Sequence, residues 1–143
     1  MIDINYSLQI AYQTALTGID DVPVFFNGLP PNISPDSYIV HKNFTHTDAS
    51  TMNSVDLNSQ VTIEIQTFED GINSGQKVAM ITREVFNRVY PYPGFVLTID
   101  GAQMVSTRLL NDITNQAINV GNRAYISRFL TFGHKIYLRS DIS

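Results

Sequence analysis

The chain contains no cysteine and no tryptophan among its 143 residues. Without cysteine, disulfide bonds, thiolate metal sites and a cysteine nucleophile are all excluded, so folding rests on packing and hydrogen bonding. No apolar run approaches the ~20 residues that cross a bilayer, and the start MIDINYSLQ lacks the basic and apolar segments of a secretory signal. We therefore expect a protein that is made in the cytoplasm and does not contact a membrane.

The sequence also contains few positively charged residues. Nine Lys and Arg residues stand against 13 Asp and Glu, which gives a net charge of −4 and a pI near 5.1. Nucleic-acid binders gain affinity when Lys and Arg replace the counterions of the phosphates, so tight binding to DNA is disfavoured. An acidic surface is compatible with DNA that slides past, because like charges repel, and equally with simple solubility.

The sequence lacks the usual signs of a catalytic or metal site. His41, His46 and His134 form no helical i, i+4 pair and have no carboxylate at ligand spacing, which favours ordinary surface or strand-end histidines. The acid pairs Asp20-Asp21 and Glu69-Asp70 are neighbours in sequence beside turn residues, where acids cap or are solvated. The sequence therefore predicts no catalytic, cofactor-binding or metal-binding residues.

Two further motifs also have a structural explanation. Residues 70–75 contain two glycines before a helix but no phosphate-gripping lysine, so a turn with a helix cap explains them better than a nucleotide loop. The serines and threonines between Thr45 and Thr62 have no G-x-S-x-G context. The arginines suit pairing with carboxylates of a neighbouring subunit, while intrachain pairs and solvated side chains are equally compatible. They are Arg83, Arg88, Arg108, Arg123, Arg128 and Arg139.

The clearest structural signal is residues 61–88. Val61, Ile63 and Ile65 alternate with polar residues, which predicts a half-buried strand. After a turn, apolar residues recur at helical spacing, so a helix follows, with Asn73 as its N-cap and Pro91 as its stop.

Further elements follow from the same patterns. A short amphipathic helix near Ile4–Leu16 is closed by Gly18, and residues 22–26 form an edge strand at best, because Pro23 lies within it. A rigid exposed loop covers residues 27–36, and residues 38–41 are extended.

Later in the chain, Asp100-Gly101 suits a type I′ turn, which predicts a hairpin of residues 95–99 and 102–110. Residues 123–132 form another alternating strand, which Gly133-His134 should break. Two polar segments remain. We expect residues 42–60 to be a long loop or extended hairpin tip, and residues 111–122 to be a second loop, both serving as arms that contact other chains.

Strands grouped around single helices predict an α+β fold: an antiparallel β-sheet packed by two helices on one face, with long loop or hairpin arms. We expect residues 1–143 to form a single domain. The last strands carry apolar residues on both faces, more than one helical layer covers, and this surplus indicates a subunit interface.

As an order of elements, most of the chain resembles the tail-completion, or tail-terminator, proteins of long-tailed bacteriophages. The likeness rests on the N-terminal helix, the Leu29-Pro30-Pro31 segment leading to Val40, the strand VTIEIQTF, the helix VAMITREVFNRVY, a hairpin, a loop and a closing strand. Residues 42–60 depart from it, being longer and more polar than this family's pattern.

The resemblance implies a non-enzymatic virion protein of the tail or neck that is assembled in the host cytoplasm and has no cofactor. Such proteins form homo-oligomeric rings, usually hexamers, at the head-proximal end of the tail tube. There they stop polymerisation and join the tube protein to the head-completion or connector proteins, with a channel through which DNA passes without specific binding. A head-completion adaptor ring of the neck is the alternative, and a small enzymatic or ligand-binding α+β domain is a further one.

Overall fold

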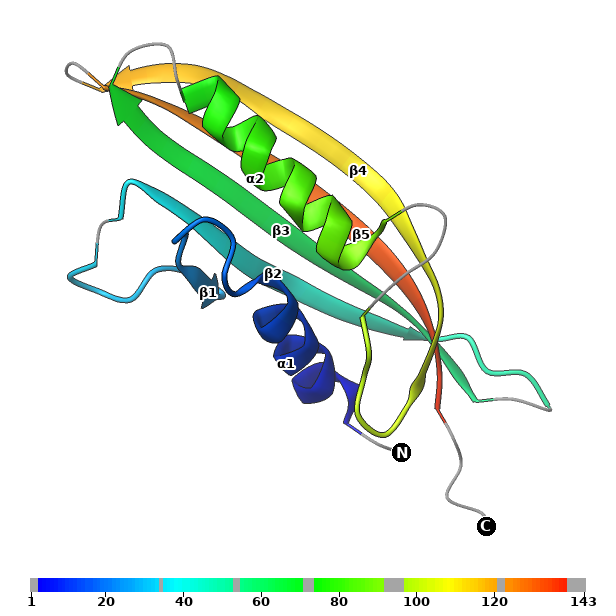
Figure 1. Cartoon of the computed structure of the whole chain (residues 1–143). Helices are drawn as coiled ribbons and strands as arrows, with labels where there is room; N and C mark the ends of the chain where they lie inside the picture. The colour runs from blue at the N-terminus through cyan, green and yellow to red at the C-terminus, as the bar shows by residue number, and fades with distance from the viewer. Residues whose placement is uncertain are drawn as a thin grey trace.

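The computed structural model describes residues 3–33, 35–52, 55–70, 74–91, 97–120 and 123–138, apart from the side chains of residues 69, 70, 74, 116–120, 123 and 124. Figure 1 shows one curved sheet with both helices on the same side of it. The architecture is the expected α+β fold with two helices on one face. The elements are α1 (Ile4–Leu16), β1 (Val24–Phe26), β2 (Ser37–Asp48), β3 (Asp56–Asp70), α2 (Ser74–Val89), β4 (Gln103–Val120) and β5 (Arg123–Tyr137).

The five strands are ordered β1-β2-β3-β5-β4. β2, β3, β5 and β4 pair antiparallel, as expected, but the short strand β1 pairs with β2 in parallel, so the sheet is mixed at this edge. The reason lies in the segment between β1 and β2, where Asn27 and Asn32 adopt positive φ angles of 68° and 72°. These turns bring the chain back so that β2 starts in the same direction as β1.

Helix α1 forms where the sequence places it. Asp3 caps its start by accepting a hydrogen bond from the Asn5 amide, and Gly18 follows its end with φ of 93°. Ile4, Leu8, Tyr12 and Leu16 recur every four residues and are buried. This spacing puts the four side chains on the helix face that packs on the sheet.

Helix α2 buries the apolar stripe predicted for it and ends at Val89, close before Pro91. It packs on β3 and β5, while α1 packs on β1 and β2 and against α2. The predicted cap Asn73 lies outside the described residues. Among the described residues, neither helix is long and apolar enough to cross a bilayer.

The hydrophobic core lies between the helices and the sheet. Val61, Ile63 and Ile65 of β3 are fully buried, which confirms the alternation read from the sequence. Opposite them in the sheet, Leu130 of β5 pairs with Ile63 and Phe132 pairs with Val61, so one face of both strands is apolar. Burial of such side chains contributes about 1.5–3 kcal/mol each, which makes this layer the main source of stability.

Residues 42–60 form an extended hairpin, which confirms one of the two expectations for this segment and excludes the other, a long loop. β2 continues to Asp48 and β3 begins at Asp56, so only residues 49–55 connect the two strands. The polar composition alone does not distinguish a loop from a solvent-exposed hairpin. In this hairpin the ladder from Thr45↔Gln60 to Asp48↔Leu57 satisfies the backbone, and the side chains of Thr45, Thr47, Asn58 and Gln60 are exposed to solvent.

The expectation of a loop at residues 111–122 was wrong. β4 runs through them as far as Val120, and it pairs with β5 from Asn111↔Thr131 to Val120↔Arg123. Residues 111–115 are exposed, because β4 is an edge strand and only its β5 side is paired. An edge strand tolerates polar residues on both faces. The alternation of apolar and polar residues that predicts a strand from sequence is then missing.

The predicted hairpin at Asp100-Gly101 does not form. Gly101 does take a positive φ of 81° in a turn, but residues 97–99 are not in a strand. Leu97 and Ile99 instead join the hydrophobic core, so burial of their side chains replaces strand pairing. Phe95 lies outside the described residues. After the turn, β4 pairs with β5 rather than with the segment before it.

The predicted break at Gly133-His134 is absent, and β5 continues to Tyr137. Gly133 pairs with Gln60 and Arg108, and His134 pairs with Ser59 and Thr107. The strand continues because both neighbours extend past this point and because the His134 ring is buried between hydrogen-bond partners.

Candidate functional site

The expectation of surface or strand-end histidines is wrong for two of the three, because His41 and His134 are buried and lie within β2 and β5. Tyr12 of α1 hydrogen-bonds to His134 Nε2 at 2.5 Å, and Thr107 of β4 hydrogen-bonds to His134 Nδ1 at 2.9 Å. We assign Tyr12 as the donor to Nε2, which leaves Nδ1–H to donate to Thr107. This chain of three residues fixes α1 on the sheet.

His41 and His46 make two further links between α1 and the sheet. His41 Nε2 lies 2.7 Å from Gln13 Oε1, and Gln13 in turn donates to the Val24 carbonyl. His46 bridges Asn5 Oδ1 at 3.0 Å and the Ser59 hydroxyl at 2.7 Å. Each histidine therefore ties a residue of α1 to a strand, which is a structural role.

Burial determines the charge state of these rings. It lowers the pKa of His41 and of His134 from 6.5 to about 4, and it also lowers the pKa of His46. The imidazoles are therefore neutral at pH 7. Within the described part of the chain, no three His, Cys, Asp or Glu side chains come together as a possible metal site.

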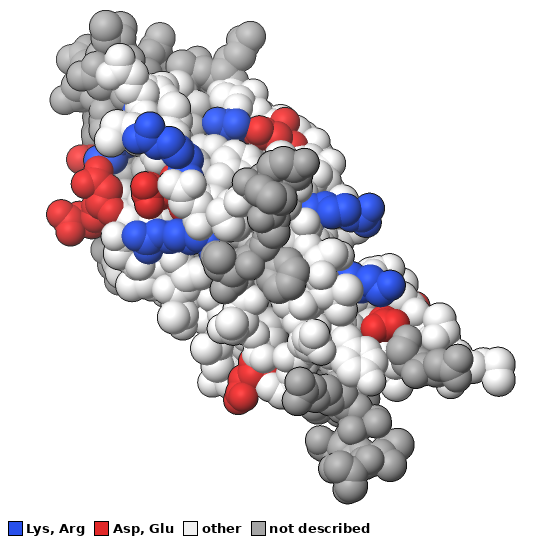
Figure 2. Space-filling model, turned by 45° about the vertical axis from the view of Figure 1, so that its right-hand side comes forward, with Lys and Arg blue, Asp and Glu red and all other residues white. Residues whose placement is uncertain are grey.

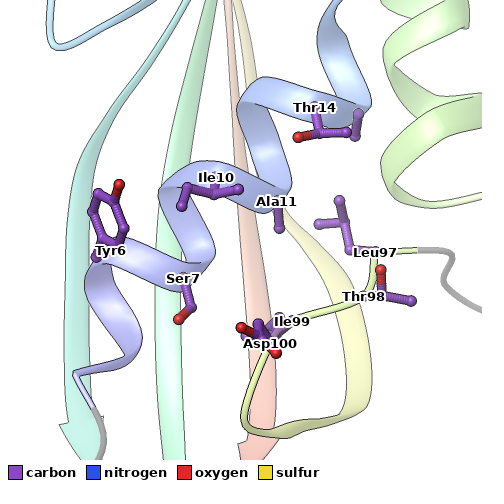
Figure 3. Close-up of a pocket in the computed structure, with 10 residues that line it drawn as sticks. Tyr6, Ser7, Ile10, Ala11, Thr14, Leu97, Thr98, Ile99 and Asp100 are labelled. Carbon is purple, nitrogen blue, oxygen red and sulfur yellow. The ribbon is translucent and has the colours of Figure 1, made fainter.

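A groove of about 650 Å³ runs between α1 and residues 97–100. Figure 3 shows Ser7 and Ala11 on the side of α1 toward that segment, with Tyr6 on the opposite side. Among the described residues of its lining, Asp100 is the one carboxylate, and the others are Tyr6, Ser7, Ile10, Ala11, Thr14, Ala15, Leu97, Thr98 and Ile99. These described residues offer contact area but no acid–base pair.

The more distinctive surface is the sheet face away from the helices, which we call the uncovered face. Aromatic side chains gather there: Phe68 stacks on Tyr125 with ring centroids 4.8 Å apart, and Lys42 lies 5.4 Å from the centre of the Phe129 ring. Lys42 also pairs with Glu64 at 2.6 Å. Burial, followed by the charge and hydrogen bond of Glu64, raises the pKa of Tyr38 to about 12.

These residues share one face because β3 alternates. Glu64 and Phe68 point away from the helices, whereas Ile63 and Ile65 point into the core. Tyr125 and Phe129 on β5 remain half-buried, which fits the predicted apolar surplus on the last strands. A half-buried aromatic layer around a charge pair is typical of a surface that packs on another protein.

The arginines divide into three groups. Arg128 pairs with Asp112 through two hydrogen bonds of 2.9 and 2.7 Å, and Arg88 donates to the carbonyls of Ala15, Thr17 and Gly18. Arg83 and Arg108 form no ion pair with any described residue. The side chains of Arg123 and Arg139 lie outside the described part.

The carboxylates weighed as acid–base candidates do not converge. Asp20 lies 3.7 Å from Lys77 of α2 and is largely exposed, and Asp21 is exposed beside it. The side chains of Glu69 and Asp70 are outside the described set, although their backbones complete β3. The buried Tyr12–His134–Thr107 chain is what sequence reasoning missed. The one hint in the sequence was the position of His134, which takes the place of an apolar residue in the alternating pattern of β5.

Neither the protein-family models nor the curated proteins contain a match to this chain. Among solved structures, the fold matches a chain of the structure titled "Virion of native gene transfer agent (GTA) particle", with a TM-score of 0.70. The match covers 96% of this chain and 99% of that chain at 15% sequence identity. At this identity the likeness shows a shared fold. This chain thus shares its α+β fold with that chain over nearly the whole length of both.

Proposed function

We propose that this protein is a structural, non-enzymatic component of a phage-like virion. The observation that carries the proposal is the match to a chain of a gene transfer agent particle, which spans 96% of one chain and 99% of the other. The likeness extends over nearly the full length of both chains, so the shared fold accounts for almost all of these residues. It also supports treating residues 1–143 as one domain.

Within the virion, we propose the place of the tail terminator. The subunit forms a ring, a hexamer in the family that the sequence resembles, at the head-proximal end of the tail tube. There it contacts the tube protein on one side and the head-completion or connector proteins on the other. The net charge of −4 supports a channel through which DNA passes without specific binding. On the face shown in Figure 2, charged side chains lie in small groups of mixed sign rather than in one positive field.

The uncovered face of the sheet supports an assembled state. Phe68, Tyr125 and Phe129 lie there without a helical layer over them, and a ring supplies neighbouring subunits that such a face can contact. A head-completion adaptor ring of the neck would also supply neighbouring subunits that contact this face. The two functions differ in the position of the ring in the particle.

The decisive experiment removes the gene product from a producing strain and measures tail lengths by electron microscopy. Loss of a tail terminator is expected to give free tails of widely varying length, because nothing stops the tube from growing. Loss of a head-completion protein instead gives tails of uniform length that are detached from heads. Normal, attached tails in the absence of this protein would contradict both assignments.

A second measurement uses the purified protein. Mass determination in solution and negative-stain images are expected to show closed rings, alone or on the ends of tail tubes. Monomers under all of these conditions, together with absence of the protein from particles, would refute the structural proposal.

A further inference from the structure

A hollow of about 430 Å³ lies on the uncovered face, away from the aromatic cluster. It is built from two rows across three strands, in which Gln60, Gly133 and Arg108 form one row and Asn58, Lys135 and Ser106 form the next. Gly133 is its floor. A Cβ at this position would come within 2.9 Å of the Leu110 side chain, so glycine is what lets Leu110 lie against the sheet.

The hollow is cationic. Arg108 and Lys135 stand on adjacent strands, one row apart on the same face, and both side chains are exposed. Within the described part of the chain, neither of them forms an ion pair. Asn58, Gln60 and Ser106 add hydrogen-bond donors around them. Two unpaired cations above polar donors suit a pair of carboxylates.

The described surface also carries a pair of neighbouring carboxylates, Asp20 and Asp21, in the turn after α1. Both residues adopt left-handed backbone conformations, with φ of 42° and 58°. Asp20 contacts Lys77 of α2 only at 3.7 Å, and Asp21 has no ion pair among the described residues. This acidic turn belongs to the helical side of the molecule, whereas the hollow is on the opposite face of the sheet.

We propose that the hollow at Arg108 and Lys135 binds the Asp20-Asp21 turn of a second copy of this chain. The two sites lie on opposite sides of the sheet, so they cannot meet within one copy. A contact between two different surfaces of identical subunits is heterologous, and it closes into a ring when the rotation between subunits permits. The inference therefore rests on the proposed ring and names the charged contact that orders its subunits.

A protein carboxylate is favoured over a DNA phosphate as the occupant. The hollow offers two cations and the turn offers two anions, so the charges match. The chain as a whole is negative, with a charge of −4, which opposes a second polyanion at this site. DNA binding is nevertheless a distinguishable outcome of the test.

The test uses two charge-reversed variants of the full chain. The first carries Arg108→Glu and Lys135→Glu, and the second carries Asp20→Lys and Asp21→Lys. Each alone brings like charges together at every interface, and we expect about tenfold weaker association per interface at low salt. In an equal mixture, the negative hollow of the first variant can bind the positive turn of the second. The unchanged positive hollow of the second variant can bind the unchanged negative turn of the first. The mixture is therefore expected to regain rings in which the variants alternate.

Native mass spectrometry and negative-stain images measure ring formation, and far-UV circular dichroism checks that each variant folds. Arg83→Glu is the matched control, because Arg83 is exposed on α2 and has no ion pair among the described residues. It should leave ring formation unchanged. If the reversed turn impairs folding, Asp20→Asn with Asp21→Asn keeps residues that tolerate the left-handed conformation, and it should still weaken the rings.

The outcomes separate the two proposals. If the unmodified protein forms rings and both reversed variants do so equally well, the charged contact is wrong while the ring function stands. Rings that persist in the Arg108→Glu, Lys135→Glu variant together with loss of salt-sensitive DNA binding would make the hollow a phosphate site and also overturn the contact. If the unmodified protein is monomeric both alone and with tail tubes, the proposed function fails and the contact fails with it.

Discussion

The phenolic oxygen of Tyr12 lies 2.5 Å from Nε2 of His134, although the two residues are 122 positions apart in the chain. Tyr12 belongs to α1 and His134 to β5, so one buried hydrogen bond joins the first helix to the last described strand. Both side chains are almost fully buried. This bond is therefore a sensitive reporter of whether the core has formed.

Replacing Tyr12 by Phe removes the hydroxyl and leaves His134 Nε2 buried without its partner. We expect the free energy of unfolding to fall by about 1–3 kcal/mol, the usual penalty for an unsatisfied buried polar group. Urea unfolding followed by far-UV circular dichroism measures it. Tyr6→Phe is the matched control, because Tyr6 is 65% exposed, and it should change stability by less than about 0.5 kcal/mol.

Stability should fall as the pH drops from about 6.5 to about 4. The pKa of His41 and of His134 is lowered to about 4 in the folded protein, whereas an unfolded chain protonates them near 6.5. Between about pH 6.5 and about pH 4 the unfolded state therefore binds more protons than the folded state, so the free energy of unfolding falls as the pH is lowered. It reaches its full value only above about pH 6.5. For His134 the loss is about 3 kcal/mol, at about 1.4 kcal/mol per pKa unit.

Urea midpoints at several pH values between 7.5 and 4 test this dependence. A His134→Gln variant keeps hydrogen-bonding capacity but cannot titrate, so its stability should vary less steeply with pH. An equal slope in the two proteins would show that His134 is not responsible. Asp112 acts in a different window: the Arg128 hydrogen bonds lower its pKa, so its contribution is lost only on further acidification, below about pH 4.

Arg88 of α2 should be worth more to stability than its exposed neighbour Arg83. The Arg88 guanidinium donates to three carbonyls at the end of α1, and these carbonyls have no partner within that helix. We expect Arg88→Ala to lower the free energy of unfolding by about 1–2 kcal/mol, since hydrogen bonds from charged donors are among the stronger ones. Arg83→Ala should be nearly neutral. Equal effects of the two changes would contradict a capping role.

The Arg128–Asp112 pair should contribute only modestly to stability. Its bidentate geometry is good, but both side chains are about a quarter exposed, at 25% and 30%. A double-mutant cycle with Arg128→Ala and Asp112→Ala is expected to give a coupling of about 0.2–1 kcal/mol that weakens in high salt. A coupling above about 2 kcal/mol would mean that the pair is desolvated in the protein's working state, as it would be inside an assembly.

The parts of the fold that sequence predicts well are those where one side of an element is apolar and the other is not. Val61, Ile63 and Ile65 alternate with polar residues, and the buried residues of α1 recur every four positions, so the face and the period were both readable. The Pro-containing residues 22–26 were correctly confined to a sheet edge, where β1 lies.

The failures occur where tertiary context decides. Gly133-His134 has the composition of a turn, but neighbours on both sides and a buried hydrogen-bond network hold it in β5. Residues 111–115 are polar throughout, and only their pairing to β5 makes them strand. The Tyr12–His134 link was unreadable because its partners are far apart in sequence, and the hollow at Gly133 depends on how rows from three strands align.

The sheet order has a consequence for synthesis of the protein. β3 pairs along its whole length with β5, which is synthesised only after α2 and β4. Until then β3 keeps one unpaired edge, and α1 lacks its hydrogen bond to His134. A chain that ends before β5 therefore cannot complete its core.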